Sequence, residues 1–328
     1  MNEYLFHLFF IFYSIFIYKY RIKIANSLKL IDFPDNLRKS HSNPVPCIGG
    51  IILYPYIISS IFFIFFLSLI KFKILLLWIF LFSSFFFKGL IDDRINLNAK
   101  TKTFILIFIL FIILPLDKSL IIQSINFKNL NMTIILNEGS LFFTIFCIYF
   151  FYNSLNFSDG YNGISITLTL YILFVIFVAR NELNLFHASC ILGLILILIP
   201  NLFGKLFIGN SGVSLLSIIL SVLLIESYNK GYILFDEIIL IVFLPTIDAA
   251  RITIERIING KSPFESDKNH FHHILTNITK KEIVFLPYLI FATLPYLITK
   301  LNIPSYISLI TFTCLYFVAL FIINKLNA

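Results

Sequence analysis

The chain alternates between long apolar runs and short polar islands. Each run approaches the length of a membrane-spanning helix, which needs about 20 mostly apolar residues. The runs are Tyr4–Ile17, Ile51–Ile70, Ile74–Phe87, Thr103–Leu116, Leu141–Phe151, Ile164–Val178, Leu185–Leu198, Val213–Ile225, Ile233–Leu244, Ile283–Ile298 and Ile303–Ile323. No soluble fold buries so many helices that are hydrophobic on all sides. The pattern therefore predicts an all-α integral membrane protein with about eleven transmembrane helices in a single multi-span domain, residues 1–328.

Lysine and arginine predict which side of the membrane each island faces. With eleven spans, 18 of the 25 Lys and Arg residues and all the polar islands fall on one side. That side is cytosolic, because cytoplasmic loops carry the excess of positive charge. The longest segment on the outer side, Leu116–Gly139, contains "LIIQSINF" and "NMTIIL", which predict a small β-hairpin around Lys128–Asn131.

Composition supports a membrane protein. Only 13% of the 328 residues are charged, about half the usual share of a soluble domain. The net charge of +8 is explained by topology, so we expect no nucleic-acid partner. The four cysteines show no disulfide or zinc spacing. The first run opens with Met1-Asn2-Glu3 and lacks a basic start, so we expect a retained span and not a cleaved signal.

Two islands suggest a cation and phosphate site. Asp92 and Asp93 in "KGLIDDR" end a span, and Mg²⁺ is typically held by one or two carboxylates plus substrate phosphates. The plainer alternative is a solvated helix end paired with Arg94. In "GKLFIGNSG", glycines flank Asn210 and Ser211 before a span, and N–H groups at a helix start favour phosphate. Phe207 could stack on a nucleobase, whereas a simple cap at Ser211 is the alternative.

A third island, "NSLNFSDGYNGIS", is rich in hydrogen-bonding groups. Asn153 and Asn156 share one helix face, Asp159-Gly160 ends that helix, and Asn162-Gly163 makes a second turn. Such a loop suits a ribose, a base edge or a diphosphate. Ordinary helix-ending turn chemistry is the alternative.

Two basic islands complete the set. "GKSPFESDKNHFHHIL" holds three histidines, His270, His272 and His273, beside lysines, and "DNLRKSHSNPVPCIGGI" holds Lys39 and His41. The histidines lack the i,i+4 spacing and the cysteines typical of zinc sites. A cationic patch of this kind neutralises phosphates in transfer reactions.

These islands together resemble the polyprenyl-phosphate N-acetylhexosamine-1-phosphate transferases of glycosyltransferase family 4. "RKSHSNPVPCIGG", "GLIDDR", "NSLNFSDGYNG" and "IERIINGKSPFESDKNHFHHIL" follow the family's motifs in order through nearly the whole chain. The spaced His-x-His-His is more similar to the glycan-initiating branch, the undecaprenyl-phosphate GlcNAc-1-phosphate transferases, than to the peptidoglycan branch.

The resemblance implies a site, a reaction and a location. Catalytic residues would be Asp92, Asp93, Asp159, His270, His272 and His273; substrate-binding residues would be Lys39, His41, Asn153, Asn156, Asn162 and Phe207; metal ligands would be Asp92, Asp93 and Asn210, for Mg²⁺ or alternatively Mn²⁺. The enzyme would transfer N-acetylhexosamine-1-phosphate, with GlcNAc-1-phosphate expected, from a UDP-sugar to polyprenyl (undecaprenyl) phosphate and release UMP. It would lie in the bacterial inner membrane with its site facing the cytoplasm, and a homodimer is left open.

Two departures from the family pattern keep other functions open. Asn210 stands where the family has a metal-binding Asp, and Cys47 replaces a usual Arg. They leave open the alternative of a non-catalytic or altered-specificity member that binds UDP-sugar or lipid phosphate. A membrane transporter would carry ionisable groups near the bilayer midplane, whereas these runs are almost free of charge. The downstream acidic array of CDP-alcohol phosphotransferases is absent from the sequence.

Overall fold

The computed structural model describes residues 3–34, 43–128, 132–262 and 269–326. Contacts within the chain divide it into two compact units, each built from two segments. Unit 1 comprises Met1–Leu116 and Asn181–Ile219, and unit 2 comprises Asp117–Arg180 and Leu220–Ala328. The prediction that residues 1–328 form a single domain stays a prediction.

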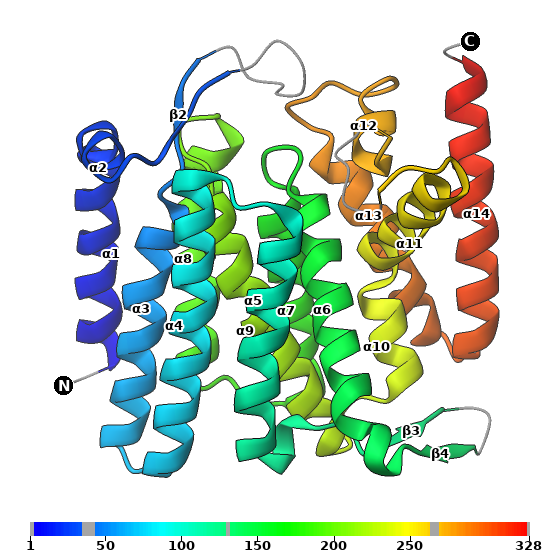
Figure 1. The fold of residues 1–328 in the computed structure, drawn as a ribbon, viewed down its shortest axis with the longest axis horizontal. Coiled ribbons are helices and arrows are strands. Elements are labelled where there is room, and N and C mark those ends of the chain that lie inside the picture. Colours follow the sequence, from blue (N-terminus) through cyan, green and yellow to red (C-terminus); the bar gives the residue numbers. More distant parts are fainter. Residues whose placement is uncertain (1–2, 35–42, 129–131, 263–268, 327–328) are drawn as a thin grey trace. The chain divides into compact units, whose positions relative to one another are not determined.

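Unit 1 is built mainly of apolar helices (Figure 1). Its elements are α1 (Glu3–Lys19), α2 (Arg21–Leu28), β1 (Ile31–Asp32), β2 (Val45–Pro46), α3 (Gly49–Phe66), α4 (Phe72–Ile95), α5 (Ala99–Ile113), η1 (Leu114–Leu116), α8 (Leu185–Leu202) and the first half of α9 (Gly209–Asn229).

The start of α3, the end of α4 and the start of α9 lie at one end of unit 1 (Figure 1). The chain bends by 74° between α1 and α2. Strands β1 and β2 pair antiparallel, with Ile31 opposite Pro46. Cys47, the next residue, forms a parallel bridge with Phe207, which lies just before α9. These pairings hold the start of α3 against the start of α9.

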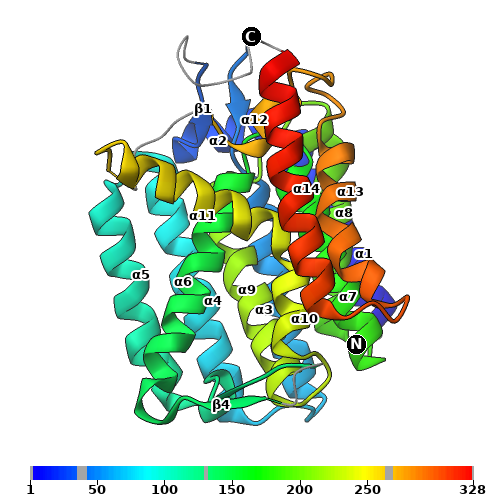
Figure 2. The same cartoon turned by 90° about the vertical axis from the view of Figure 1, so that its right-hand side faces the viewer.

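Unit 2 holds the remaining helices and a hairpin. Its elements are η2 (Lys118–Leu120), β3 (Ser124–Asn126), β4 (Thr133–Ile135), η3 (Asn137–Gly139), α6 (Ser140–Ser158), α7 (Ile164–Arg180), the second half of α9, α10 (Phe235–Ile241), α11 (Phe243–Ile258), α12 (Phe271–Leu275), α13 (Phe285–Thr299) and α14 (Ser305–Leu326). Strands β3 and β4 pair antiparallel, which confirms the predicted hairpin. Within this unit the hairpin and α12 lie at opposite ends of the helices (Figures 1 and 2).

The helices confirm an all-α membrane protein, but the count of eleven spans is not confirmed. Ten of the eleven predicted runs each coincide with one helix, yet seven described helices are long and apolar enough to cross a bilayer, or eight if α1 and α2 form one bent span. Helices α7 and α13 are apolar but shorter. The run at 233–244 is interrupted because Pro245 has no N–H to bond the carbonyl of Ile241, so α10 stops after seven residues.

Burial separates the central helix from the helices that face lipid. The apolar window of α9 is 94% buried, against 22% for α5 and 28% for α14. Small residues such as Ser214 and Ser217 let neighbouring helices approach α9 closely. Large apolar side chains remain exposed on the outer helices, among them Phe104 on α5 and Phe321 on α14. Such surfaces are stable in contact with lipid and not with water.

Candidate functional site

Asp93 connects the end of α4 to the start of α9. Its two carboxylate oxygens accept hydrogen bonds from the backbone N–H groups of Asn210, at 2.7 Å, and Ser211, at 2.9 Å. The first N–H groups of a helix have no partner inside the helix. The partial positive charge at that end also stabilises a carboxylate. Asp93 is therefore held at the turn that carries Asn210.

Gly89 makes this approach of the two helices feasible. A Cβ atom at position 89 would lie 2.4 Å from the carbonyl oxygen of Asn210 and 2.6 Å from Cα of Ser211. Any side chain would therefore push α4 away from the start of α9. On the other side, the N–H groups of Gly49 and Gly50 donate to the carbonyls of Phe207 and Ile208, each at 3.0 Å.

Asp92 has a different environment from its neighbour. It is 1% exposed, accepts the N–H of Leu97 at 3.0 Å, and forms an ion pair with Lys102 at 2.8 Å. It is thus a buried, charge-paired residue and not the solvated helix end with Arg94 that the sequence left open. Lys102 was missed from the sequence, although a lysine in the first turn of the next helix was the available signal.

The predicted base-stacking residue lies beside this cluster. Phe207 is half-buried, and its N–H donates to the carbonyl of Pro46 at 2.9 Å. Lys39 and His41, predicted to contact phosphates, lie outside the described residues.

The donor set fits magnesium in type, although the described protein ligands alone are few. Each oxygen of Asp93 accepts one hydrogen bond and retains a further lone pair, and an amide oxygen such as that of Asn210 is also an accepted ligand. The ammonium of Lys102 is paired with Asp92 and would compete with a metal ion for that carboxylate. Among the described residues, no three His, Cys, Asp or Glu side chains gather as a metal cluster. An ion here would therefore need substrate phosphates to complete its coordination.

The Asp159 turn lies in unit 2, between α6 and α7. Asp159 follows the last residue of α6 and accepts a hydrogen bond from the hydroxyl of Ser165 in the first turn of α7. The amide of Asn153 donates to the carbonyl of Tyr149 at 2.8 Å. Asn156 accepts the N–H of Asp159 through its carbonyl, and Asn162 lies half-buried in the turn. These hydrogen bonds fix the conformation of the turn between α6 and α7.

His272 packs directly behind that turn. It is 1% exposed, and its Nε2 atom would lie only 2.1 Å from a Cβ atom at position 160, so Gly160 leaves the room it needs. Its ring stacks on that of His270, with centroids 5.5 Å apart. Neither ring nitrogen has a hydrogen-bond partner among the described residues. Burial, then the neighbouring rings of His273 and His270, lower the pKa of His272 well below its ordinary value.

His273 lies nearer the surface than His272. Its Nδ1 atom lies 3.4 Å from the hydroxyl of Tyr161, a residue of the Asp159 turn. Tyr161 also makes edge contacts with both rings. The structure thus brings together, within unit 2, the island "NSLNFSDGYNGIS" and the histidines of "GKSPFESDKNHFHHIL".

A buried carboxylate that sequence reasoning missed anchors the histidines. Asp248 on α11 accepts hydrogen bonds from His270 Nδ1 at 2.9 Å, Phe271 N–H at 3.1 Å, Arg251 at 2.9 Å and the Tyr316 hydroxyl at 2.6 Å. Burial alone would raise the pKa of Asp248, but the hydrogen bond and charge of His270 and the charge of Arg251 outweigh it, so the pKa is lowered. The only sequence signal was an Asp and an Arg three residues apart on one helix face.

The structure therefore assembles two clusters from the predicted residues. In unit 1, Asp93 meets the turn of Asn210, with Asp92 beside Asp93 on α4 and Phe207 just before α9. In unit 2, the Asp159 turn meets His272 and His273. That both clusters serve one nucleotide stays a prediction.

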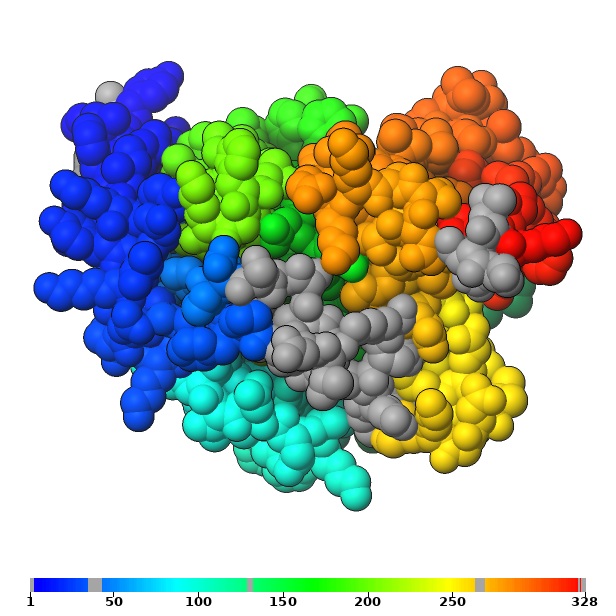
Figure 3. All heavy atoms as spheres, turned by 90° about the horizontal axis from the view of Figure 1, so that it is seen from above, coloured from blue at the N-terminus to red at the C-terminus, as the bar shows by residue number. Residues whose placement is uncertain are grey.

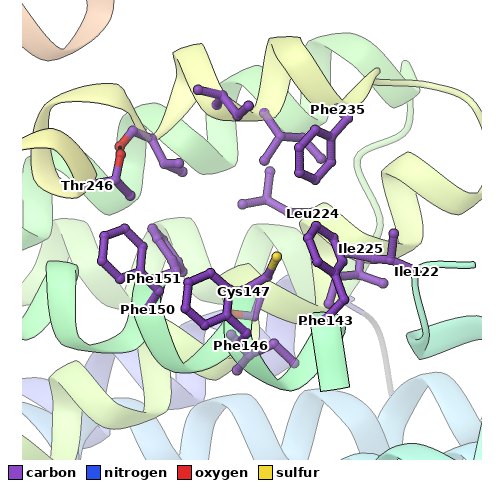
Figure 4. Close-up of a pocket in the computed structure, with 15 residues that line it drawn as sticks. Ile122, Phe143, Phe146, Cys147, Phe150, Phe151, Leu224, Ile225, Phe235 and Thr246 are labelled. Carbon is purple, nitrogen blue, oxygen red and sulfur yellow. Dashed lines mark hydrogen bonds between the residues drawn. The ribbon is translucent and has the colours of Figure 1, made fainter. Parts of the chain in front are cut away.

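Unit 2 also contains an apolar pocket of about 320 Å³ (Figure 4). It is lined by side chains of α6, α9, α10 and the start of α11, including Phe146, Phe150, Leu224 and Phe235. The hydroxyl of Thr246 at its edge donates to the carbonyl of Val242, so it is already satisfied. The pocket suits an apolar occupant.

Sequence comparison with known proteins finds a family and several relatives. Residues 74–228 match the family model for glycosyl transferase family 4. The chain is 27% identical over 278 residues to the undecaprenyl-phosphate alpha-N-acetylglucosaminyl 1-phosphate transferase of Salmonella typhi, which covers 81% of this chain and 74% of that protein. The Escherichia coli K12 protein of the same name is 25% identical over 280 residues, with the same shares. The decaprenyl-phosphate N-acetylglucosaminephosphotransferase of Mycobacterium leprae is 24% identical over 306 residues, with shares of 81% and 75%.

The helical fold and the polar clusters at its helix ends define a multi-span membrane protein of the transferase class. More narrowly, residues 74–228 are similar to glycosyl transferase family 4, and the relatives described above are named as undecaprenyl- or decaprenyl-phosphate N-acetylglucosamine-phosphate transferases. The resemblance recognised in the sequence is confirmed.

Proposed function

We propose that this protein transfers GlcNAc-1-phosphate from UDP-GlcNAc to undecaprenyl phosphate at the cytoplasmic face of a bacterial inner membrane. The observation that carries the proposal is the match, along 81% of the chain, to relatives named as undecaprenyl- or decaprenyl-phosphate N-acetylglucosamine-phosphate transferases. Support comes from the two clusters, which supply carboxylate, amide and imidazole groups at helix ends. These are the groups that a nucleoside diphosphate and a phosphate acceptor need.

The reaction is a substitution at phosphorus. An oxygen of the acceptor phosphate attacks the β-phosphorus of the UDP-sugar, a new P–O bond forms, and the bond from that phosphorus to the bridging oxygen breaks. UMP leaves with the bridging oxygen, and the lipid carries a diphosphate sugar. The acceptor phosphate is largely dianionic at neutral pH, since its second pKa is about 6. No proton must therefore be removed from it, and the main barrier is the approach of two polyanions in line.

The residues of the chain act on that repulsion. In unit 2, His273 and Tyr161 present polar atoms at the Asp159 turn, while buried His272 supports the turn from behind. In unit 1, Asp93 fixes the start of α9, whose glycine-flanked turn orients backbone groups. Phe207 would lie against uracil. Donors fixed before substrate arrives stabilise developing charge without reorganising.

A magnesium ion would be held by Asp93 and Asn210, and Asp92 would join them once Lys102 leaves. When bound, it would offset phosphate charge as a Lewis acid. Manganese, which prefers similar ligands, is an alternative ion.

The apolar pocket of unit 2 suits the prenyl chain of the acceptor. Its volume of about 320 Å³ and its wall of phenylalanine, leucine and isoleucine match a branched hydrocarbon (Figure 4). Pockets for small apolar ligands typically begin near 300 Å³. A prenyl chain held there would keep the acceptor at the membrane while its phosphate reaches the polar loops.

The proposal is tested by product formation in membranes. Membranes containing the protein are incubated with radiolabelled UDP-GlcNAc, UDP-GalNAc or UDP-glucose and with undecaprenyl phosphate, and the lipids are extracted. We expect a labelled lipid diphosphate and stoichiometric UMP from UDP-GlcNAc, and a loss of both in Asp93→Ala. Near wild-type turnover in Asp93→Ala would remove the role given to that carboxylate.

A second function is favoured by Asn210, which brings no charge to the turn. It is binding of UDP-sugar or lipid phosphate without transfer. It predicts that UDP-GlcNAc protects the protein against thermal unfolding while no UDP-sugar yields UMP. The same membranes and nucleotides decide between the two functions.

A further inference from the structure

A second groove lies in unit 1 and takes no part in the proposed reaction. It has a volume of about 350 Å³ and runs between α1, α3 and α8. Its walls are mostly apolar and include Ile15, Ile52, Leu196 and Ile199, whereas Lys205 lies at one end. A groove with an apolar length and a cationic end is complementary to an amphipathic anion.

The bend between α1 and α2 indicates how deep that cationic end lies. A helix that turns by 74° away from a spanning helix runs nearly along the membrane surface. Helix α2 carries exposed Ile22 between Arg21 and exposed Lys23, a mixture typical of the headgroup region. Tyr18, which lines the groove with Lys205, is only one turn before the bend. Lys205 therefore lies at headgroup depth.

A second cation lies against Tyr18, a lining residue of the groove. The guanidinium of Arg21 lies 4.5 Å from the centre of the Tyr18 ring and donates to the carbonyl of Tyr18 at 3.2 Å. The ammonium of Lys205 lies 5.8 Å from the Phe203 ring, another lining residue. From above, the blue atoms of the N-terminal part of the chain border the yellow-green atoms of the part that includes the segment after α8 (Figure 3). Lys205 thus lines the groove, and Arg21 lies beside one of its lining residues.

The rest of the groove descends to hydrocarbon depth. From Phe203 to Leu196, α8 falls by seven residues, or about 10 Å along the helix. The hydroxyl of Ser14 donates to the carbonyl of Phe10 at 2.7 Å, so it offers no free donor to a ligand. The exposed faces of Ile15 and Ile199 open the groove toward lipid. This length accommodates the upper part of one acyl chain.

We propose that this groove binds an anionic phospholipid, with its phosphate between Arg21 and Lys205 and one acyl chain along Leu196 and Ile52. The binding site does not depend on the transferase reaction, so failure of one assignment leaves the other standing. A lipid bound in this groove would contact both α1 and α8 and so stabilise their packing.

The test measures lipid binding by the purified full-length chain. Native mass spectrometry in detergent gives dissociation constants for phosphatidylglycerol and for phosphatidylcholine with identical acyl chains. One cation near the surface is worth about fivefold in affinity for an anionic lipid. We expect the wild-type chain to prefer phosphatidylglycerol by at least that factor, and Lys205→Glu to lose the preference. Lys205→Gln, which removes the charge without reversing it, should bind phosphatidylglycerol about fivefold more weakly than the wild-type chain.

The control is Lys100→Glu, which makes the same charge change at an exposed lysine of unit 1 outside the groove, and it should keep the preference. Ile199→Trp, which fills the groove, should weaken binding of both lipids. Equal affinity of the wild-type chain for both lipids would overturn the proposal, as would equal loss in Lys205→Glu and Lys100→Glu. Displacement of phosphatidylglycerol from the groove by undecaprenyl phosphate would also overturn it, by making the groove an acceptor site.

Discussion

Asp248 lies 2.9 Å from Nδ1 of His270, and the same carboxylate is shared with Arg251 on its own helix. The pair spans 22 residues of sequence and is buried, with each side chain less than 10% exposed. The ring of His270 stacks on that of His272, which lies behind the Asp159 turn. By holding His270, Asp248 therefore also fixes the position of His272. Asp248 is therefore a positioning residue for the histidines.

Asp248→Asn should be strongly destabilising. The amide cannot balance the buried Arg251, and breaking a buried ion pair by neutralising one partner costs about 3 kcal/mol or more. We expect a lowered unfolding temperature and a lowered kcat. The matched control is Glu255→Gln, since Glu255 pairs with the same Arg251 at the same 2.9 Å but is 46% exposed. It should cost less than about 1 kcal/mol. Equal losses in the two variants would contradict the role given to Asp248.

Gly160→Ala should disturb His272 by contact alone. Its new methyl group would lie 2.1 Å from Nε2 of His272, so the ring or the turn must move, at a cost of about 1–3 kcal/mol. UMP release should fall, and the double variant Gly160→Ala/His272→Ala should recover stability relative to Gly160→Ala. The control is Gly139→Ala, where no atom lies within 4 Å and the backbone is already helical. If both alanine variants unfold at the same temperature, the contact is not important.

Stability should depend on pH through His272. The folded chain keeps this ring neutral, so its pKa lies below the ordinary 6.5, whereas the unfolded chain takes up a proton near pH 6.5. As pH falls below 6.5 the unfolded state binds the extra proton, and the free energy of unfolding falls by up to about 1.4 kcal/mol per pH unit. His270, His273, Asp248, Tyr161 and Tyr288 surround the ring.

Thermal unfolding between pH 7.5 and pH 5 measures this slope. His272→Gln should show a shallower loss than the wild-type chain over the same range. Asp248 does not interfere, because its lowered pKa matters only as pH falls below its ordinary value of 3.8. Parallel pH profiles for the two proteins would mean that His272 titrates alike in the folded and unfolded states.

Asn210→Asp should make the protein more dependent on magnesium. The N–H of residue 210 donates to Asp93, so a second carboxylate enters beside the first and repels it when no cation is present. We expect a lower unfolding temperature without Mg²⁺, its recovery on adding Mg²⁺, and about a tenfold lower half-saturating concentration. An unchanged magnesium titration would mean that position 210 is not a ligand.

The hydrophobic pattern predicted the helices better than their number of crossings. The apolar runs became helical because backbone groups in lipid must be bonded within the segment, although the run at 233–244 is divided between α10 and α11. Helix lengths depend on local breaks, such as the missing N–H of Pro245, and on bends such as that at Tyr20, which hydrophobicity does not record. The hairpin was visible because alternating residues flank a polar turn.

The polar islands predicted which residues form the site, but not their partners. Asp93 and Asn210 were both recognised, yet their hydrogen bond joins positions 117 residues apart, and nothing in either motif specifies the other. Asp248 and Lys102 were missed because their sequence signals, an Asp and an Arg three residues apart and a lysine in a first helical turn, are too weak to mark a site. What determines their importance is burial, which depends on the packed structure.

The Asp248 network gives the last helix of the chain a role beyond anchoring. Tyr316, fully buried on α14, donates its hydroxyl to Asp248 and accepts from Arg251 at 2.7 Å. A premature stop codon before position 316 would therefore remove a hydrogen-bond donor to Asp248, which holds the histidine cluster, as well as a membrane anchor. Such a truncated product would be inactive even if it inserts into the bilayer, because the histidines lose the Tyr316 hydroxyl on Asp248 and the Tyr316 ring on Phe271.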